Sequence, residues 1–433
     1  MNRARELLAP WQPSVREPFD LARAGHLLRR GAFGGSLALR RSLVARGVDA
    51  ALDELFDPSS DPQLDAGFTD VVAFDDIERV RAYWVWRMVQ GPPRIRARMT
   101  LFWHDHFATS NVKVRSARLM ARQLQLFERA GLGKFDALLL EVSRDPAMVR
   151  WLDSESNVRG RANENYAREL FELFTLGVGQ YSEQDVKEAA RAFTGWHLRG
   201  ESFAFRQRFH DGAAKRVLGR RGALGGEDVV ALAAAHPASA RFVARKLLAF
   251  FVHPRPTTAE VDALAAAYRD AGRDLGATLR VLLRSRLFFS PRAWRSRIKS
   301  PVDFVVGMVR CLGGRAAPLR LTRAIADMGQ VLLEPPNVAG WPGERAWMTS
   351  ATWLARTNFA GRLFTAAYKT HPAAATVLER PRPAQRADLA IELLLDGVID
   401  DTARQAIHRL AETGVPPADL LHAVQCLPEG HLL

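Results

Sequence analysis

The sequence contains little of what marks several common protein classes. Its 433 residues include two cysteines, Cys311 and Cys426, which exclude a cysteine-based zinc site and allow one disulfide at most. Its longest apolar runs, such as residues 247–252, fall far short of the roughly 20 residues that cross a bilayer. The N-terminal segment has basic residues but no apolar stretch of signal-peptide length. These absences predict a soluble, cytoplasmic protein without a membrane span.

Acidic residues and lysine are scarce beside arginine. There are 61 Lys and Arg residues against 47 Asp and Glu residues, a formal net charge of +14, and all but seven of the basic residues are arginine. Such an excess favours an anionic partner. The arginines are spread along the chain without a block of five or six, however, so nucleic-acid binding is only weakly indicated.

Familiar catalytic motifs are missing as well. The sequence has no His-Glu-x-x-His, no Glu-x-x-His and no Gly-x-Ser-x-Gly, and Gly131–Lys134 lacks the Ser or Thr that completes a phosphate-binding loop. It has no Gly-x-Gly-x-x-Gly either. The common zinc-protease, hydrolase, kinase and dinucleotide-dependent oxidoreductase classes therefore lose support.

What the sequence does contain is helical periodicity. Asp20 and Ser36 are placed to cap two early helices, and residues 94–108 and 163–176 read as further helices. Between Trp196 and Phe209 the period changes to two, which predicts one small β-hairpin. We expect a mainly α, irregular multi-helix domain over residues 1–370, with this hairpin inserted and a C-terminal helical appendage over 371–433.

Seven motifs occur in an order that resembles one bacterial family, the domain of unknown function 1800. They span about residues 20–365 and are His26–Gly34, Phe102–Ser110, Asn163–Gly177, Tyr181–Trp196, His210–Lys215, Lys299–Phe304 and Pro335–Gly343. The resemblance implies a predominantly helical fold and no established activity. Its members often look exported, and their genes often sit beside a second family, the domain of unknown function 1501, which resembles phosphatases and sulfatases. Members often carry His where this chain has Phe174, which argues against chemistry that needs an imidazole there.

The predicted helix at residues 163–176 gathers charged side chains on one side. On a helical wheel, Glu164, Arg168, Glu169 and Glu172 share a face with Asn165, within about 140° of arc. If water covers that face, the charges form ordinary ion pairs, since Glu164 and Arg168 are four residues apart. If protein covers it, the carboxylates must be paired or must bind a metal, because isolated buried charge is too costly.

Two histidines near residue 105 are candidate partners for those carboxylates. His104 and His106 are two apart, so on a helix they point about 200° apart, with His106 on the apolar stripe and His104 off it. Both reach one ion only if the helix ends there, which Thr109–Asn111 permits. The candidate metal set is His104, His106, Glu164 and Glu172, with an unspecified divalent metal as the cofactor. The alternative for His106 is a core histidine bonded to backbone or carboxylate.

Two loops supply further candidates. His210, Asp211 and Lys215 follow the predicted hairpin, and there a histidine can act as a base or ligand and a lysine can bind an anion. The alternative is a turn stabilised by Asp and Gly. His197 is a weaker candidate of the same kind. The Pro335–Gly343 loop presents Asn337 and Trp341, either to a ligand or to the core of the domain itself.

Three functional hypotheses follow. In the first, the protein is an enzyme or a ligand-binding protein with a buried carboxylate and histidine centre, in which Glu164, Arg168, Glu169, Glu172 and His210 carry the chemistry. In the second, it is a non-catalytic partner or scaffold for the phosphatase-like neighbouring family, and its arginine-rich surface meets an acidic partner. In the third, which is the weakest, it binds nucleic acid.

Overall fold

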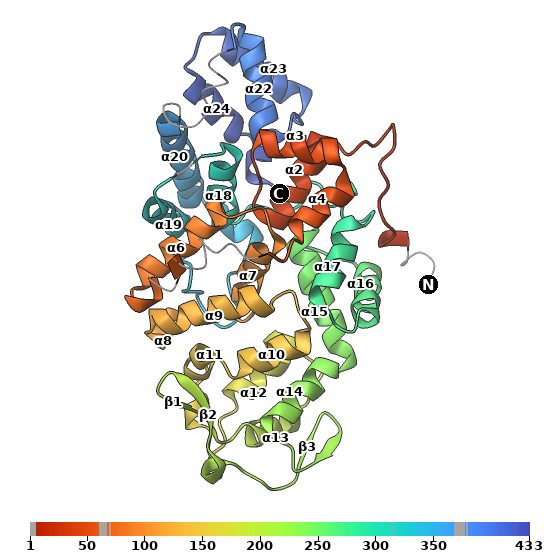
Figure 1. Ribbon diagram of the computed structural model, residues 1–433, viewed down its shortest axis with the longest axis vertical. Coiled ribbons are helices and arrows are strands. Elements are labelled where there is room, and N and C mark those ends of the chain that lie inside the picture. The colour runs from red at the N-terminus through yellow and green to blue at the C-terminus, as the bar shows by residue number, and fades with distance from the viewer. Residues whose placement is uncertain (1–5, 60–66, 69–70, 315, 368–376, 378–379) are drawn as a thin grey trace.

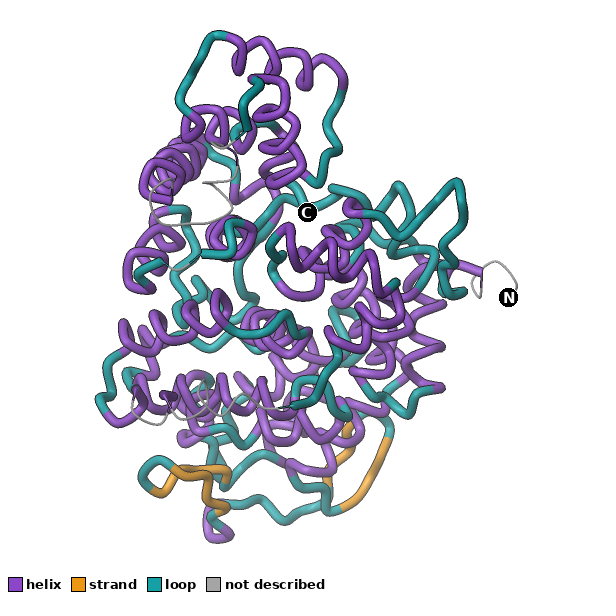
Figure 2. Tube along the Cα trace, turned by 45° about the horizontal axis from the view of Figure 1, so that its top comes forward, coloured by secondary structure: helices purple, strands orange, loops and turns teal. Residues whose placement is uncertain are grey.

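Helices make up most of the chain, as the periodicity predicts. The structure is a computed structural model and describes residues 6–59, 67–68, 71–314, 316–367, 377 and 380–433. The molecule is elongated, and its strands are confined to one end (Figures 1 and 2). The prediction of a mainly α fold with a small hairpin insertion is confirmed.

The N-terminal third supplies the helices of one flank and the centre. Asp20 and Ser36 cap the first two, because their side chains accept hydrogen bonds from the backbone N–H groups of Arg23 and Leu39. The helices are α2 (Leu21–Ala32), α3 (Leu37–Arg46), α4 (Val48–Leu55), α6 (Ile77–Gln90), α7 (Ile95–His106), α8 (Asn111–Val114) and α9 (Ala117–Ala130).

The middle of the chain builds the end that carries the strands and the flank above it (Figure 1). Its helical elements are α10 (Phe135–Ser143), α11 (Pro146–Trp151), η1 (Ser154–Ser156), α12 (Asn165–Glu169), η2 (Leu170–Thr175), α13 (Glu183–Ala192), η3 (Gln207–Phe209), α14 (Gly226–Ala235), α15 (Pro237–Phe251), α16 (Thr258–Asp270) and α17 (Leu275–Arg284).

Two antiparallel hairpins interrupt these helices. Strand β1 (Trp196–Arg199) pairs with β2 (Ser202–Phe205), with Trp196 opposite Phe205, which confirms the predicted hairpin. A second hairpin, which the sequence did not predict, pairs β3 (Lys215–Val217) with β4 (Arg220–Gly222). Its three-residue strands are too short for a visible period of two. Both hairpins lie at the same end of the molecule (Figure 1).

The C-terminal part forms the opposite end. It consists of α18 (Pro301–Cys311), α19 (Pro318–Asp327), η4 (Glu344–Trp347), α20 (Ser350–Ala367), α22 (Pro383–Leu395), α23 (Asp401–Glu412), α24 (Pro417–Gln425) and η5 (Pro428–His431). Helix α22 packs on α23, α24 and α18, and α20 packs on α24. The predicted boundary near residue 370 falls among residues 368–376, outside the described residues. No helix in the described ranges is long and apolar enough to cross a membrane.

Helix α7 lies between two hydrophobic cores and contributes to both. Met99, Phe102 and Trp103 belong to the core shared with α2, α4, α10 and α12–α17, whereas Leu101 belongs to the core shared with α6, α18–α20 and α22–α24. A helix buried on most of its circumference cannot expose its polar residues. The polar side chains of α7 must therefore find partners inside the protein.

Candidate functional site

The segment predicted as one helix at residues 163–176 forms two consecutive helices of different type. Asn163 accepts a hydrogen bond from the Asn165 N–H at its start, α12 follows, and from Leu170 the chain continues as the π-helix η2. The Thr175 hydroxyl donates to the Leu170 carbonyl oxygen, which completes the wider turn. The hydrophobic pattern does not distinguish 3.6 from 4.4 residues per turn over six positions. π-Helical turns occur frequently at functional sites.

The face formed by Glu164, Arg168, Glu169 and Glu172, which we call the acidic face, is half-buried. Arg168 donates to Glu164 at 3.1 Å and to Glu183 of α13 at 2.7 Å. Of the two alternatives for this face, the geometry favours ordinary ion pairing over a covered metal or catalytic centre. Helix α13 stands beside it without covering it, and its charges form ion pairs at the surface.

Two carboxylates of the acidic face have distinct environments. The Tyr181 hydroxyl donates to Glu172 at 2.9 Å, and burial together with this carboxylate raises the pKa of Tyr181 to about 12. Partial burial, and then the neighbouring charge of Glu172, raises the pKa of Glu169, while Arg168 acts in the opposite direction. Glu169 therefore holds a proton more readily than an exposed glutamate does.

The two histidines of α7 are fully inside the protein and face different elements. The ring of His106 lies against Phe174, whose carbonyl oxygen accepts from Nε2 at 3.1 Å. His104 Nε2 accepts from the backbone N–H of Leu333 at 3.2 Å. Burial lowers the pKa of each to about 3, so both rings are neutral at neutral pH.

Of the two interpretations of His106, the geometry favours the core histidine bonded to backbone over the metal ligand. The prediction that His104 points away from the core is wrong. Its ring contacts Trp84 of α6 and Trp341 of the Pro335–Gly343 loop. The distances between ring centroids are 5.4 Å and 5.5 Å. A second core covers the side of α7 that a single-core helix would leave to solvent.

The predicted metal set does not come together. His104 and His106 each bond a backbone group through Nε2, while Glu164 and Glu172 bind Arg168 and Tyr181. In the described part of the chain, no three His, Cys, Asp or Glu side chains are grouped as ligands for one ion.

Hydrogen bonds to α13 and to Thr194 hold the loop after the first hairpin, at His210 and Asp211, in place. His210 Nδ1 donates to the Thr194 carbonyl oxygen at 2.9 Å, and the Asp211 N–H donates to the Thr194 hydroxyl at 2.8 Å. Arg191 of α13 donates to the Asp211 carboxylate at 2.8 Å, and this hydrogen bond comes first among the causes that lower the pKa of Asp211. His210 and Asp211 therefore fix the loop to the end of α13.

Lys215 is not the anion-binding lysine that its position suggested. Its side chain is 2% exposed, and Nζ donates to the carbonyl oxygens of Asp211 and Ala213. Burial lowers the pKa of Lys215 against the opposing effect of Asp211. Nearby, the ring of His197 contacts that of Phe209, and burial likewise lowers the pKa of His197.

The Pro335–Gly343 loop closes the core over α7. The backbone N–H of Trp341 donates to the Asp105 carboxylate at 2.9 Å, and the indole is 9% exposed. Gly340 has φ +85°, and a Cβ there would lie 2.4 Å from an Asp105 oxygen. Asn337 is exposed and accepts from the Ala339 N–H at 2.9 Å, within its own turn. The loop could present Asn337 and Trp341 either to a ligand or to the core of the domain. The geometry favours the second interpretation for Trp341.

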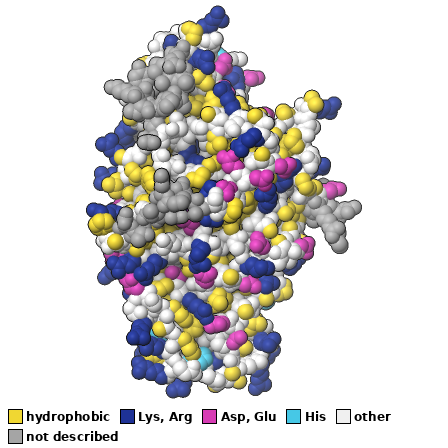
Figure 3. All heavy atoms as spheres, in the orientation of Figure 1, with side chains coloured by type: hydrophobic (Ala, Val, Ile, Leu, Met, Phe, Trp, Pro, Cys, Tyr) yellow, Lys and Arg dark blue, Asp and Glu magenta, His cyan; other side chains and the backbone are white. Residues whose placement is uncertain are grey.

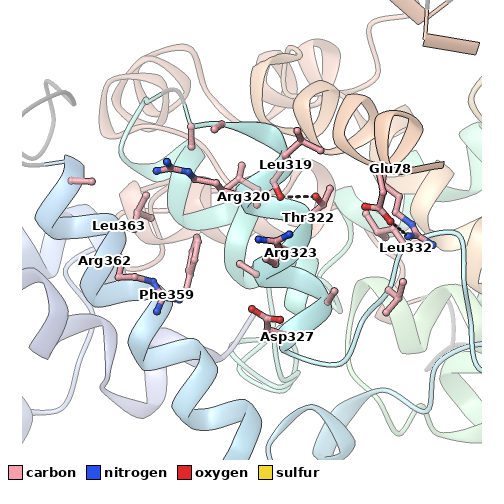
Figure 4. A pocket seen from close by; sticks show the side chains of 18 residues that line it. Glu78, Leu319, Arg320, Thr322, Arg323, Asp327, Leu332, Phe359, Arg362 and Leu363 are labelled. Atoms are coloured by element: carbon pink, nitrogen blue, oxygen red, sulfur yellow. Dashed lines mark hydrogen bonds and ion pairs between the residues drawn. The ribbon is translucent and has the colours of Figure 1, made fainter. Parts of the chain in front are cut away.

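A cavity of about 990 Å³ lies elsewhere, among α6, α19 and α20 (Figure 4). Leu319, Phe359 and Leu363 line it together with Arg320 and Arg362. Sequence reasoning missed this cavity because its walls come from three segments that share no motif. None of the predicted site residues lines it.

The end that carries both hairpins, residues 196–222, has an unusual surface, and we call it the hairpin end. Six arginines lie there, five exposed and one half-buried: Arg199, Arg206, Arg208, Arg216, Arg220 and Arg221. None of them makes a salt bridge with any described residue. Basic side chains gather on both sides of this end in Figure 3. The only sign of this basic surface in the sequence is the high density of arginine between residues 199 and 221.

Carboxylates of the hairpin end bind arginines of neighbouring elements instead. Glu201 contacts Arg118 and Arg122 of α9 at 3.5 and 3.2 Å, and Asp211 contacts Arg191. Aromatic rings lie among the free arginines. Phe205 is 48% exposed, and the Arg208 guanidinium lies 4.5 Å from the centre of the Phe209 ring. The surface combines unpaired cations with accessible aromatic area.

Fold and surface together define a mainly helical protein with a sealed polar interior and a basic end. The chain belongs to the family described as protein of unknown function DUF1800, whose family model matches residues 26–429. The match extends beyond the motifs at residues 20–365 and includes the C-terminal helices. No curated protein and no solved structure matches the chain.

Proposed function

We propose that this protein is a non-catalytic binding protein whose hairpin end docks on an acidic face of a partner protein. The observation that carries the proposal is the set of six arginines at one end of the molecule that make no salt bridge with any described residue. Guanidinium groups form bidentate hydrogen bonds with carboxylates, so such a set is suited to an acidic protein surface.

The aromatic residues of the hairpin end support the same function. Arginine and aromatic side chains are enriched at the centres of protein interfaces. Phe205 offers an exposed ring, and Arg208 is already ordered against Phe209, so less side-chain entropy is lost on binding.

Acidic residues around the hairpin end favour a protein partner over nucleic acid. Glu155, Glu227 and Asp228 are exposed on adjoining elements, and Glu155 is close enough to affect the charge of His197. Nucleic-acid binding depends on a track of uninterrupted positive charge along a phosphate backbone. A mixed pattern instead suits a partner whose own surface carries both signs.

The candidate partner is the phosphatase- and sulfatase-like family called domain of unknown function 1501. It is suggested by the gene neighbourhood that the family resemblance implies. We expect the two proteins to associate through charge, so that the complex weakens as salt screens the interaction.

The proposal is tested by measuring the affinity of the full chain for a purified member of that family at low and high salt. The combined variant Arg216→Glu, Arg220→Glu, Arg221→Glu should weaken binding by about tenfold or more. The matched control is Arg269→Glu, Arg286→Glu, Arg409→Glu, three exposed arginines away from the hairpins, which should retain the wild-type affinity.

Equal binding by both variants, or no association at low salt, would overturn the proposal. A parallel titration with duplex DNA distinguishes the third hypothesis. If the duplex binds with a steep salt dependence that the hairpin variant loses, the acidic partner is nucleic acid instead.

A second candidate, ligand binding or catalysis at the acidic face, is favoured by one observation. Glu169 is half-buried beside a π-helix, and its pKa is raised. In this form of the first hypothesis the carboxyl acts without the histidines and without a metal. A thermal-shift screen of small amines and polyols tests it. A compound that stabilises the wild type but not Glu169→Gln supports this role, and the absence of any such compound removes it.

A further inference from the structure

A small cavity lies where the N-terminal helices meet the C-terminal segment. Its volume is about 40 Å³, and it is bounded by residues of α2, α3, α18 and α22 together with Gln425 and Leu433. A water molecule needs about 10–15 Å³ of such space. The cavity therefore holds a water-sized species, with room for a larger monatomic ion.

Basic side chains outnumber acidic side chains on the cavity wall, which also includes Leu433, whose main-chain oxygen accepts from Arg30. Arg29, Arg40 and Lys299 line it, together with Asp303 and Asp396. Asp396 binds both Arg29 and Arg40. Asp303 is paired with Arg98, which is fully buried behind the wall.

Lys299 is a further basic group on this wall. Its Nζ donates to the Gly430 carbonyl oxygen at 2.8 Å and makes no salt bridge with any described residue. Burial, followed by the charges of Arg29 and Arg295, lowers the pKa of Lys299 to about 7. Lys299 is therefore divided between its charged and neutral forms near neutral pH, and an anion bound beside it would favour the charged form.

Several guanidinium nitrogens of the residues lining the cavity have no hydrogen-bond acceptor in the described part of the chain. Nε and Nη2 of Arg29 and Nε of Arg40 are inaccessible to solvent and unpartnered. The Arg40 side chain is 3% exposed, and its remaining nitrogens bind Asp396, two carbonyl oxygens of α22 and, at 3.9 Å, the Cys311 sulfur. Buried N–H donors without an acceptor are costly, and each calls for a partner.

We infer that this cavity binds a monatomic anion of the size of chloride, held by Arg29, Arg40 and Lys299. The anion accepts hydrogen bonds from the free guanidinium nitrogens and favours the charged form of Lys299. Since Asp396 belongs to the end of α22 and Arg29 and Arg40 to α2 and α3, the anion joins the C-terminal segment to the N-terminal helices. This site is distinct from the hairpin end.

The test is the thermal unfolding midpoint of the full chain, measured in sodium chloride and in sodium gluconate at one ionic strength. Gluconate is too large for the cavity. Chloride should raise the midpoint by about 4 °C in a saturable manner, as expected for a ligand that binds only the folded state. Bromide should act like chloride, and its anomalous scattering should locate it in crystals between Arg29 and Lys299.

Variant proteins make the test specific. Arg29→Met removes one cavity cation but leaves Asp396 paired with Arg40, so the chloride effect should disappear in a folded protein. Arg41→Gln, an exposed neighbour of Arg40, is the matched control and should respond as the wild type does. Should Arg29→Met fail to fold, ³⁵Cl relaxation of the wild-type protein, with bromide as competitor, replaces it.

Three results would overturn the inference. They are coincident chloride and gluconate curves, an equal effect of sulfate, and an unchanged chloride response in folded Arg29→Met. The ³⁵Cl measurement overturns it if the relaxation rate is not altered by the protein.

Discussion

Arginines are prominent both around α7 and α18 and at the hairpin end. The two groups differ in whether protein or solvent surrounds them. Arg98 is fully buried, bonded to Asp303 and placed between the rings of Phe33 and Phe250. Arg216, Arg220 and Arg221 are exposed and make no salt bridge with any described residue. The interior cations are bonded within the protein, whereas those of the hairpin end are free to bind a partner.

The difference shows why composition is a poor guide to function here. A formal net charge of +14 mixes arginines that act as structural cross-links with arginines that face solvent. Buried Arg30, for example, donates to the main-chain oxygens of Ala293 and Leu433 and to the Ser296 hydroxyl. Only the exposed group can meet a partner protein, so the two groups should respond very differently to substitution.

The largest effect is expected from removing the carboxylate at the centre of the interior. Burial opposes ionisation of Asp303, but Arg98, together with Arg297 and the Ser300 hydroxyl, holds the pKa of this carboxyl below its ordinary value. Asp303→Ala leaves Arg98 buried and unpaired, and should lower the free energy of unfolding by about 3–5 kcal/mol in urea denaturation. The exposed pair of Asp388 and Arg404 is the control, since Asp388→Ala should cost about 1 kcal/mol or less. Similar losses of stability in Asp303→Ala and Asp388→Ala would contradict the difference between interior and surface ion pairs.

A smaller effect is expected where the loop closes over α7. Gly340→Ala combines a positive φ with a Cβ placed 2.4 Å from an Asp105 oxygen, and should cost about 2–3 kcal/mol in the same assay. Gly343 also has a positive φ, +67°, but a Cβ there meets nothing within 4 Å, so Gly343→Ala should cost about 1 kcal/mol. Equal costs at the two positions would show that the loop does not pack tightly on Asp105.

The buried histidines predict a pH dependence of stability. The pKa of His104 and that of His106 are about 3 in the folded protein, below the ordinary value of 6.5. Between these values the unfolded chain binds protons that the folded protein does not, so stability rises with pH across this window and is lost as the pH falls. In His106→Gln the slope between pH 4.5 and 6.5 should decrease by about 1 kcal/mol per pH unit. An unchanged slope would mean that this ring is not sealed from solvent.

The smallest effect on stability is expected at the hairpin end. Arg216→Gln, Arg220→Gln and Arg221→Gln together should change the free energy of unfolding by about 0.5 kcal/mol or less, because none of the three holds an internal ion pair in the described structure. Urea denaturation with circular dichroism checks this. A decrease of several kcal/mol in the free energy of unfolding would mean that these arginines stabilise the fold, as the interior arginines do.

Much of the fold was predictable because it depends on local pattern. The caps at Asp20 and Ser36 and the first hairpin follow from residue types at fixed spacings, and all three are present. The β3–β4 hairpin and the π-helix at Leu170–Thr175 were not predicted. Each is too short to leave a period of its own in the sequence.

The candidate site was predicted less well, because burial is not a local property. The wheel at residues 163–176 placed Glu164 and Arg168 correctly on one face, but it gave no information on what lies against that face. His104 was assigned to the solvent side of α7, where α6 and Trp341 cover it.

The sequence by itself determined the helical class, the first hairpin, the capping residues and the family, since these depend on spacing and residue order along one chain. The tertiary structure alone decided which charges are available to a partner. Arg98 and Arg216 are chemically identical, and only the packing of distant segments surrounds one with Asp303 and two aromatic rings while leaving the other in water.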